Sequence, residues 1–90
     1  MSHTCTLRRS DDYDGLGILI ATDAQTRSLH FIREVEIGSP GHRAGLRKND
    51  RIISVNNVNV ENMDFSDVLI LIKEGIENNN LQISVIHELD

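Results

Sequence analysis

Residues 14–21 read DGLGILIA, a pair of glycines followed directly by a short apolar run. The run at 18–21 is too short for a helix and rich in β-branched residues, which predicts a strand. Glycine weakens a strand, so Gly15 and Gly17 need a use. They either only turn the chain into the strand, or they expose backbone N–H groups to an anion. This stretch alone leaves both interpretations open.

Length and composition predict a single domain over residues 1–90, with its core at about residues 5–87. A chain of 90 residues is long enough for one modest core and too short for two. Hydrophobic residues make up 39% of the chain and tryptophan is absent, so the core must be built from Ile, Leu and Val. Such side chains suit the packing of a sheet.

The charge pattern excludes a general nucleic-acid surface, because a net charge of −5 offers no basic face to neutralise phosphates. Cys5 is the only cysteine and cannot form an intrachain disulfide, which favours a reducing cytoplasm. No apolar run approaches the ~20 residues that cross a bilayer. We therefore expect a cytoplasmic, soluble domain that is not inserted in a membrane, associates with membranes only through partners and does not bind nucleic acid.

Short apolar stretches separated by polar turns predict six strands. The third stretch loses its alternation near Arg33 and Glu34, which indicates a break or β-bulge. Asn57 is suited to a tight turn, because asparagine tolerates the left-handed region. The expected strands are residues 5–9, 18–21, 29–37, 52–55, 58–60 and 81–86.

Two helices are expected between these strands. Ser39 is placed to cap a very short one that Gly45 ends. Asp64 is placed to cap a longer one from Phe65 to about Glu74, which Gly75 stops. The predicted fold is mainly β: a small antiparallel β-sandwich or partial barrel of five to six strands, capped by one short and one longer helix.

The longer helix is apolar over more of its circumference than one core contact requires. Phe65, Leu69 and Ile72 form one stripe about 60° wide, while Val68 and Leu71 lie beside it. Either all five enter the core, or the stripe forms a second face that something must cover. If the strand at 18–21 is a sheet edge next to this helix, the gap suits an extended peptide that adds as one more strand.

Four blocks of sequence together resemble a PDZ domain of the kind found in animal scaffold proteins. The resemblance covers about residues 7–86, and the order and spacing of the blocks are specific. The blocks are GLGI (15–18), GSPGHRAGL (38–46), NDRIISVNNVNV (49–60) and FSDVLILIKEG (65–75).

The resemblance implies a protein-interaction module that captures free C-terminal peptides. The backbone N–H groups of the GLGI loop would hold the terminal carboxylate, and a basic residue before the loop would assist through water. Arg9 is the candidate for that role, with Arg8 as the alternative. The loop residues are Gly15, Leu16, Gly17 and Ile18.

The resemblance also implies two side-chain pockets. Many family members carry a histidine at the first position of the longer helix, which bonds a ligand Ser or Thr; Phe65 has no polar atom for this. Ligands with apolar residues at the last position and two before it are therefore favoured over Ser/Thr-x-apolar ligands. The pocket residues would be Leu16, Ile18, Ile20 and Ile72 for the last side chain, and Phe65 and Leu69 for the earlier one.

Enzymatic or metal chemistry has no positive support in the sequence. The four histidines are scattered, and no nucleophile elbow or phosphate loop is present.

The expected partners are C-terminal tails of other proteins, including membrane receptors, channels or transporters. The alternatives are ligands with internal motifs, or a role as a regulatory domain of a larger enzyme. We expect no cofactor, and a monomer, because the charged end at 88–90 suits an apolar pocket poorly. The histidines are His3, His30, His42 and His87. Of these, His42 is expected at the surface, and His30 is expected to face solvent or the groove edge.

Overall fold

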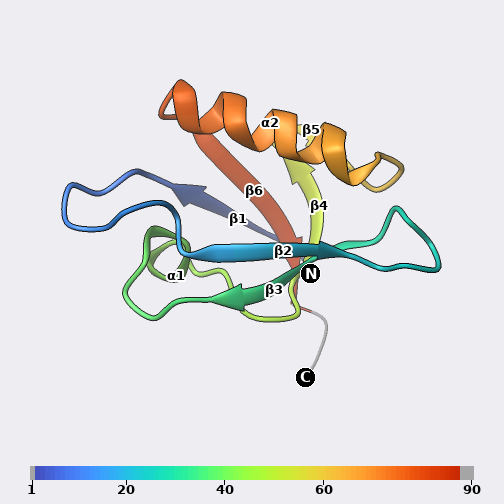
Figure 1. Cartoon of the computed structure of the whole chain (residues 1–90), viewed down its shortest axis with the longest axis horizontal. Helices are drawn as coiled ribbons and strands as arrows, with labels where there is room; N and C mark the ends of the chain where they lie inside the picture. The colour runs from blue at the N-terminus through green and yellow to red at the C-terminus, as the bar shows by residue number, and fades with distance from the viewer. Residues whose placement is uncertain (1, 88–90) are drawn as a thin grey trace.

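A computed structural model describes residues 2–87 as six antiparallel strands and two helices (Figure 1). This confirms the mainly-β class predicted from the sequence. The elements are β1 (Ser2–Leu7), β2 (Ile18–Thr22), β3 (His30–Val35), α1 (Pro40–Arg43), β4 (Arg51–Val55), β5 (Val58–Asn59), α2 (Phe65–Glu77) and β6 (Leu81–Ile86).

The sheet runs in the order β1-β6-β4-β3-β2, and β5 pairs with β4. Within residues 2–87, the strand β2 therefore stands at one end of the sheet with β3 as its single neighbour. Figure 1 shows α2 running above β2 along the same side of the molecule. One edge of the sheet is thus left open beside the longer helix.

The predicted β-bulge lies in β3. Leu19 of β2 is opposite Glu34, but its neighbour Ile20 is opposite Ile32. Arg33 is therefore the extra residue, at the place where the alternation of the sequence slips. A bulge of this kind bends and twists the strand, which shapes the adjoining end of β2.

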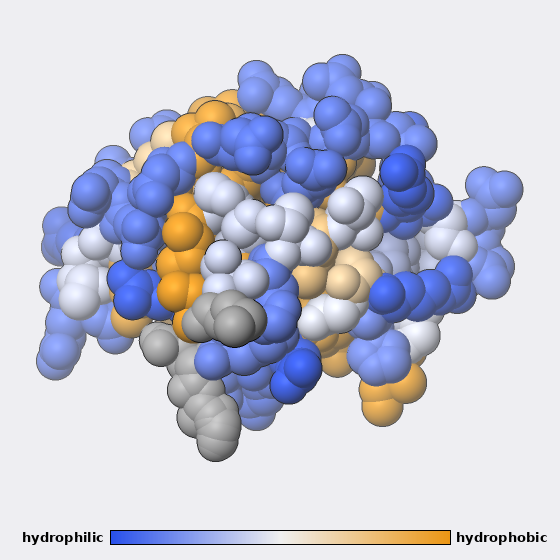
Figure 2. Space-filling model, turned by 180° about the vertical axis from the view of Figure 1, so that it is seen from behind, coloured by the Kyte–Doolittle hydropathy of each residue, from blue (hydrophilic) through white to orange (hydrophobic). Residues whose placement is uncertain are grey.

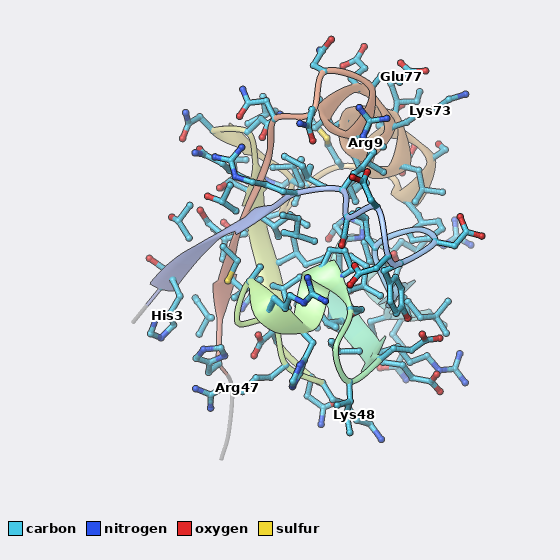
Figure 3. The ribbon with its side chains drawn as sticks, turned by 90° about the vertical axis from the view of Figure 1, so that its left-hand side faces the viewer. His3, Arg9, Arg47, Lys48, Lys73 and Glu77 are labelled. Carbon is cyan, nitrogen blue, oxygen red and sulfur yellow. The ribbon has the colours of Figure 1, made fainter. Side chains whose placement is uncertain are left out.

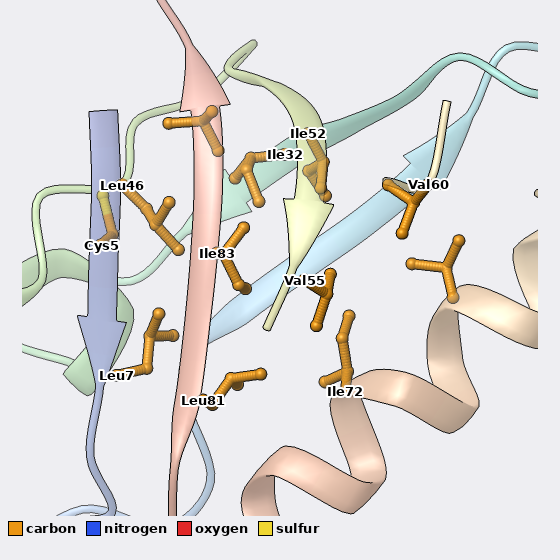
Figure 4. Packing of buried hydrophobic residues seen from close by; sticks show 12 residues of the cluster. Cys5, Leu7, Ile32, Leu46, Ile52, Val55, Val60, Ile72, Leu81 and Ile83 are labelled. Atoms are coloured by element: carbon orange, nitrogen blue, oxygen red, sulfur yellow. The ribbon is translucent and has the colours of Figure 1, made fainter. Parts of the chain in front are cut away.

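The core lies between the sheet and α2. Val68 and Ile72 come from the helix, and Figure 4 shows Ile72 pointing toward Val55 of β4. The buried cluster contains Cys5, Leu7, Ile32, Leu46, Ile52, Val55, Val60, Val68, Ile72, Leu81, Ile83 and Val85. As the composition predicts, these are mostly aliphatic side chains.

The short helix α1 has the predicted cap. The Ser39 hydroxyl accepts the backbone N–H of His42 at 3.2 Å, and Pro40 occupies the first helical position. Gly45 follows the helix with φ +98°, in the left-handed region that ends helices. His42 is exposed, as expected.

The prediction that Gly75 stops α2 is wrong, because the helix continues to Glu77. Gly75 is buried, and a Cβ there would lie 2.8 Å from Cδ1 of Leu81. The glycine therefore lets the helix approach β6 closely. The residue that ends the helix is Asn79, with φ +50°.

The C-terminal end of α2 forms a Schellman motif. The N–H of Asn80 donates to the carbonyl of Gly75 at 2.8 Å, and the N–H of Asn79 donates to that of Ile76 at 3.0 Å. These two bonds satisfy carbonyls that the helix would otherwise leave unpaired.

Other boundaries also differ from the prediction. The strand β1 starts at Ser2 and ends at Leu7, because its pairing with β6 runs from Ser2–Ile86 to Leu7–Leu81. Arg8 and Arg9 therefore lie in the following loop. Asp64 has the extended backbone of a cap, but its side chain makes no capping bond, and its carbonyl accepts the N–H of Val68 instead.

The expectation that His30 faces solvent or the groove edge is wrong, since this side chain is only 1% exposed. The charged end at 88–90 lies outside the described residues. No helix within residues 2–87 combines the length and the apolar character needed to cross a membrane.

Candidate functional site

An open apolar groove of about 330 Å³ lies between β2 and α2. One wall comes from β2 and the loop before it, and the other from one face of α2. The lining residues are Leu16, Ile18, Leu19, Ile20, Phe65, Leu69, Ile72 and Ile76. Figure 2, which views the molecule from behind Figure 1, shows a mainly hydrophilic surface with several hydrophobic areas.

The helical wall follows from the spacing of its residues. Phe65, Leu69, Ile72 and Ile76 recur at intervals of four, three and four residues, so they form one stripe along α2. Val68 lies on the core side of this stripe and is fully buried. The second apolar face predicted from the sequence therefore exists, and Ile72 serves both the groove and the core.

All six predicted pocket residues line the groove, and two lining residues were not predicted. Ile76 was missed because the helix was expected to end at Glu74, although Ile72 and Ile76 are four residues apart and share a face. Leu19 was missed because alternation places its side chain opposite to those of Ile18 and Ile20. It is 49% exposed at the rim.

The two glycines of the opening stretch both have left-handed backbones, with φ +84° at Gly15 and +70° at Gly17. At Gly17 there is a second constraint, because a Cβ would lie 2.1 Å from the Cβ of Ser39. Glycine is thus required here both to turn the chain and to pack the loop on the start of α1.

Two peptide groups of this loop are held by their carbonyls. The carbonyl of Leu16 accepts the N–H of Gly41 at 2.9 Å, and the carbonyl of Gly17 accepts the N–H of Glu36 at 2.8 Å. In a trans peptide the C=O and N–H groups point in opposite directions. The N–H groups of Gly17 and Ile18 therefore point away from Gly41 and Glu36.

Arg9 lies next to the groove, in a hollow that shares Leu16 and Ile76 with it. It lines a hollow of about 240 Å³ together with Gly15, Leu16 and Ile76, and Asp14 also borders this hollow. Figure 3 shows Arg9 below the end of α2 that carries Lys73 and Glu77. Within residues 2–87, Arg9 forms no ion pair.

Acidic groups lie near the start of β2. Glu34 and Glu36 border a shallow hollow with Leu19 on the outer side of the strand. In the loop before β2, the hydroxyl of Ser10 donates to Asp12 and, with the nearby Arg43, lowers the pKa of that carboxyl. Asp12 therefore stays ionised, and its carboxylate interacts with Ser10 and Arg43 of the same chain.

The described residues 2–87 contain no group of three or more His, Cys, Asp or Glu side chains that could hold a metal ion. His87 contacts the buried carboxylate of Asp50, and its ring stacks on that of His3 with centroids 4.3 Å apart. Both interactions lie away from the residues that line the groove.

A family model described as PDZ domain matches residues 31–83. The Na(+)/H(+) exchange regulatory cofactor NHE-RF2 of Mus musculus is 41% identical over 69 residues, which is 77% of this chain and 20% of that protein. The cofactor NHE-RF1 of Gallus gallus is 39% identical over 57 residues, or 63% of this chain and 17% of that protein. The chain thus spans about a fifth of the length of these relatives.

Solved structures agree in fold. The second PDZ domain of Dlg1 from the choanoflagellate Monosiga brevicollis superposes with a TM-score of 0.82 at 22% identity, covering 98% of this chain and all of that one. The PDZ domain of a choanoflagellate SHANK1, bound to a GIRK3 peptide, gives 0.81 at 22% identity over 99% of this chain and 94% of that one. With its matching family model, strand order and edge groove, the chain belongs to the PDZ domain family.

Proposed function

We propose that the groove between β2 and α2 binds the free C-termini of other proteins, which add to β2 as a further antiparallel strand. The observation that carries this proposal is the orientation of the N–H groups of Gly17 and Ile18, whose peptide carbonyls are both bonded to the body of the domain. Backbone donors held in this way suit a carboxylate, and the edge of β2 suits an extended chain.

In this arrangement the carboxylate-binding loop consists of Gly15, Leu16, Gly17 and Ile18. Arg9 assists through water, because it borders the hollow next to this loop. Its positive charge has no ionic partner within residues 2–87, so it remains available to the carboxylate.

The last side chain of the ligand enters the pocket formed by Leu16, Ile18, Ile20 and Ile72, where Ile76 adds apolar surface. A charged or strongly polar last residue would be desolvated there without a partner. We therefore expect an aliphatic last residue.

The side chain two before the end lies against Phe65 and Leu69. An apolar residue is preferred there, because a buried ligand hydroxyl without a hydrogen-bond partner costs about 1–3 kcal/mol. The preferred ligand is thus apolar at both of these positions.

The domain acts as a monomeric interaction module of an adaptor or scaffold and not as an enzyme. The relatives named as Na(+)/H(+) exchange regulatory cofactors, and the structural neighbour bound to a GIRK3 peptide, support partners among membrane proteins. The ligands are tails of receptors, channels or transporters that face the cytoplasm, where the domain is located.

The test is a pair of synthetic peptides that share an apolar-x-apolar end and differ in their terminus. Calorimetry should give micromolar affinity for the free acid, near −8 kcal/mol. The peptide with an amidated terminus should lose most of the affinity, because a neutral amide accepts the loop's backbone N–H hydrogen bonds less strongly than a charged carboxylate does. Equal affinity for the two peptides would refute carboxylate capture.

A further inference from the structure

A buried histidine connects the two walls of the groove at the end where α2 begins. His30, the first residue of β3, is 1% exposed. Its Nδ1 lies 2.7 Å from Oγ1 of Thr22, the last residue of β2. Its Nε2 lies 2.8 Å from the carbonyl oxygen of Met63, two residues before Phe65 begins α2.

The two partners determine where the ring carries its proton. The carbonyl of Met63 can only accept, so Nε2 must carry the hydrogen and donate. In the neutral ring Nδ1 then accepts the hydroxyl hydrogen of Thr22. Both ring nitrogens are satisfied, and the side chain is held in one orientation between β2 and the start of α2.

The rest of the groove has no comparable connection. Within residues 2–87, no direct hydrogen bond joins β2 to α2. The helix is held instead by packing of Val68 and Ile72 on the core. At the Phe65 end, the hydrogen-bonded link from wall to wall therefore runs through Thr22, His30 and Met63.

We propose that His30 is a positioning residue that sets the spacing between β2 and the start of α2, and so determines affinity for the ligand side chain two before the end. This inference rests on the proposed function. The side chain does not line the groove itself; it acts through Thr22 and Met63 on the position of Phe65.

Removing the link should lower the fraction of molecules whose walls have the spacing that contacts the ligand side chain two before the end; a ligand with alanine there makes little of this contact and should not depend on the spacing. The variant Thr22→Val removes the hydroxyl with little change in volume, and Thr22→Ser keeps the hydroxyl and is the matched control. An affinity loss of about three- to tenfold corresponds to a binding-competent fraction of about 10–30%.

The experiment measures two free-acid peptides by calorimetry, one ending in Leu-Ala-Val and one in Ala-Ala-Val, against wild type and both variants. Thr22→Val should weaken the Leu-Ala-Val peptide and have little effect on Ala-Ala-Val, while Thr22→Ser should match wild type with both. Ile83→Val, a core truncation outside the groove, controls for a general loss of stability.

Ring-nitrogen NMR of wild type should show a hydrogen of His30 on Nε2, and Thr22→Val should shift the Nδ1 signal. An equal loss with both peptides, or no loss with either, would overturn the inference while leaving the proposed function intact. Thr22→Ala replaces Thr22→Val if the latter fails to fold. Absence of wild-type binding to both peptides would overturn the proposed function and this inference together.

Discussion

Gly17 packs so closely on Ser39 that a Cβ at position 17 would lie 2.1 Å from the Cβ of the serine. Ser39 is fully buried and caps α1, so it cannot move aside easily. The loop of the proposed carboxylate site and the cap of the short helix are therefore one packed unit.

Gly17→Ala should destabilise the domain more than Gly15→Ala. Both substitutions place an alanine in the left-handed region, at about 1–2 kcal/mol each. Position 15 has no atom within 4 Å of an added Cβ, whereas position 17 adds an overpacking cost of about 1–3 kcal/mol. Urea denaturation measures both values, and equal losses would contradict the packing argument.

Phe65→His should change the selectivity of the groove. A histidine at the start of α2 would offer a polar atom to a ligand Ser or Thr two before the end. We expect the preference to move from Leu toward Ser or Thr at that position, measured with paired free-acid peptides. Phe65→Leu, which stays apolar, is the control, and unchanged selectivity in Phe65→His would show that Phe65 does not border this pocket.

Charge near the outer side of β2 should favour basic residues in the ligand. Glu34 and Glu36 border the hollow beside Leu19. Replacing a neutral ligand residue before the last position by Arg should strengthen binding by about 0.2–1 kcal/mol at low salt. The gain should shrink in 1 M salt and in Glu34→Gln. A gain that salt leaves unchanged would not be electrostatic.

The turn between β4 and β5 predicts opposite effects at adjacent asparagines. Asn56 and Asn57 have φ of +49° and +68°, as in the two-residue turns that favour Asn-Gly. Asn57 is exposed, so Asn57→Gly should raise the free energy of unfolding by about 0.5–1 kcal/mol through relief of strain.

Asn56→Gly is the matched control and should destabilise by about 1–3 kcal/mol. The side chain of Asn56 donates to the carbonyl of Asn80 at 2.8 Å and accepts the N–H of Gln82 at 2.7 Å. Chemical denaturation of both variants gives the comparison. Stabilisation by both would mean that these two side-chain bonds contribute nothing.

Burial raises the pKa of the Cys5 thiol, and the charge of Asp50 raises it further. In the unfolded chain the thiol ionises near its ordinary pKa of about 8.5, while the folded thiol stays protonated. Folding stability should therefore fall as the pH rises above that value. Cys5→Ala should reduce this slope between about pH 8 and 10, and the same slope in both proteins would contradict the shift.

Much of this fold follows from local sequence. Alternation and turn residues predicted the strands, the bulge at Arg33 and the cap at Ser39, because each depends on neighbours within a few positions. The end of α2 was predicted wrongly at Gly75, because this glycine allows a close approach to Leu81 that only the folded chain reveals. Six of the residues that line the groove were predicted, three on α2 through helical spacing and family resemblance and three before or in β2 through the resemblance alone, and Ile76 was missed because the predicted helix ended too early.

His30 shows a different limit. Nothing in the stretch LHFIREVEI distinguishes a histidine that faces solvent from one that bonds Thr22 and Met63. Its partners lie 8 and 33 residues away, so tertiary structure decides its role.

The open edge of β2 has a consequence for the stability of the whole domain. Without a ligand, the outward backbone amides of this strand should exchange hydrogen with water through local openings of low free energy. A docked tail would shield them and add a term that grows with the logarithm of its concentration to the folding free energy. The melting temperature would then report the fraction of the domain that is bound to ligand, and the bound domain would unfold less often than the free one.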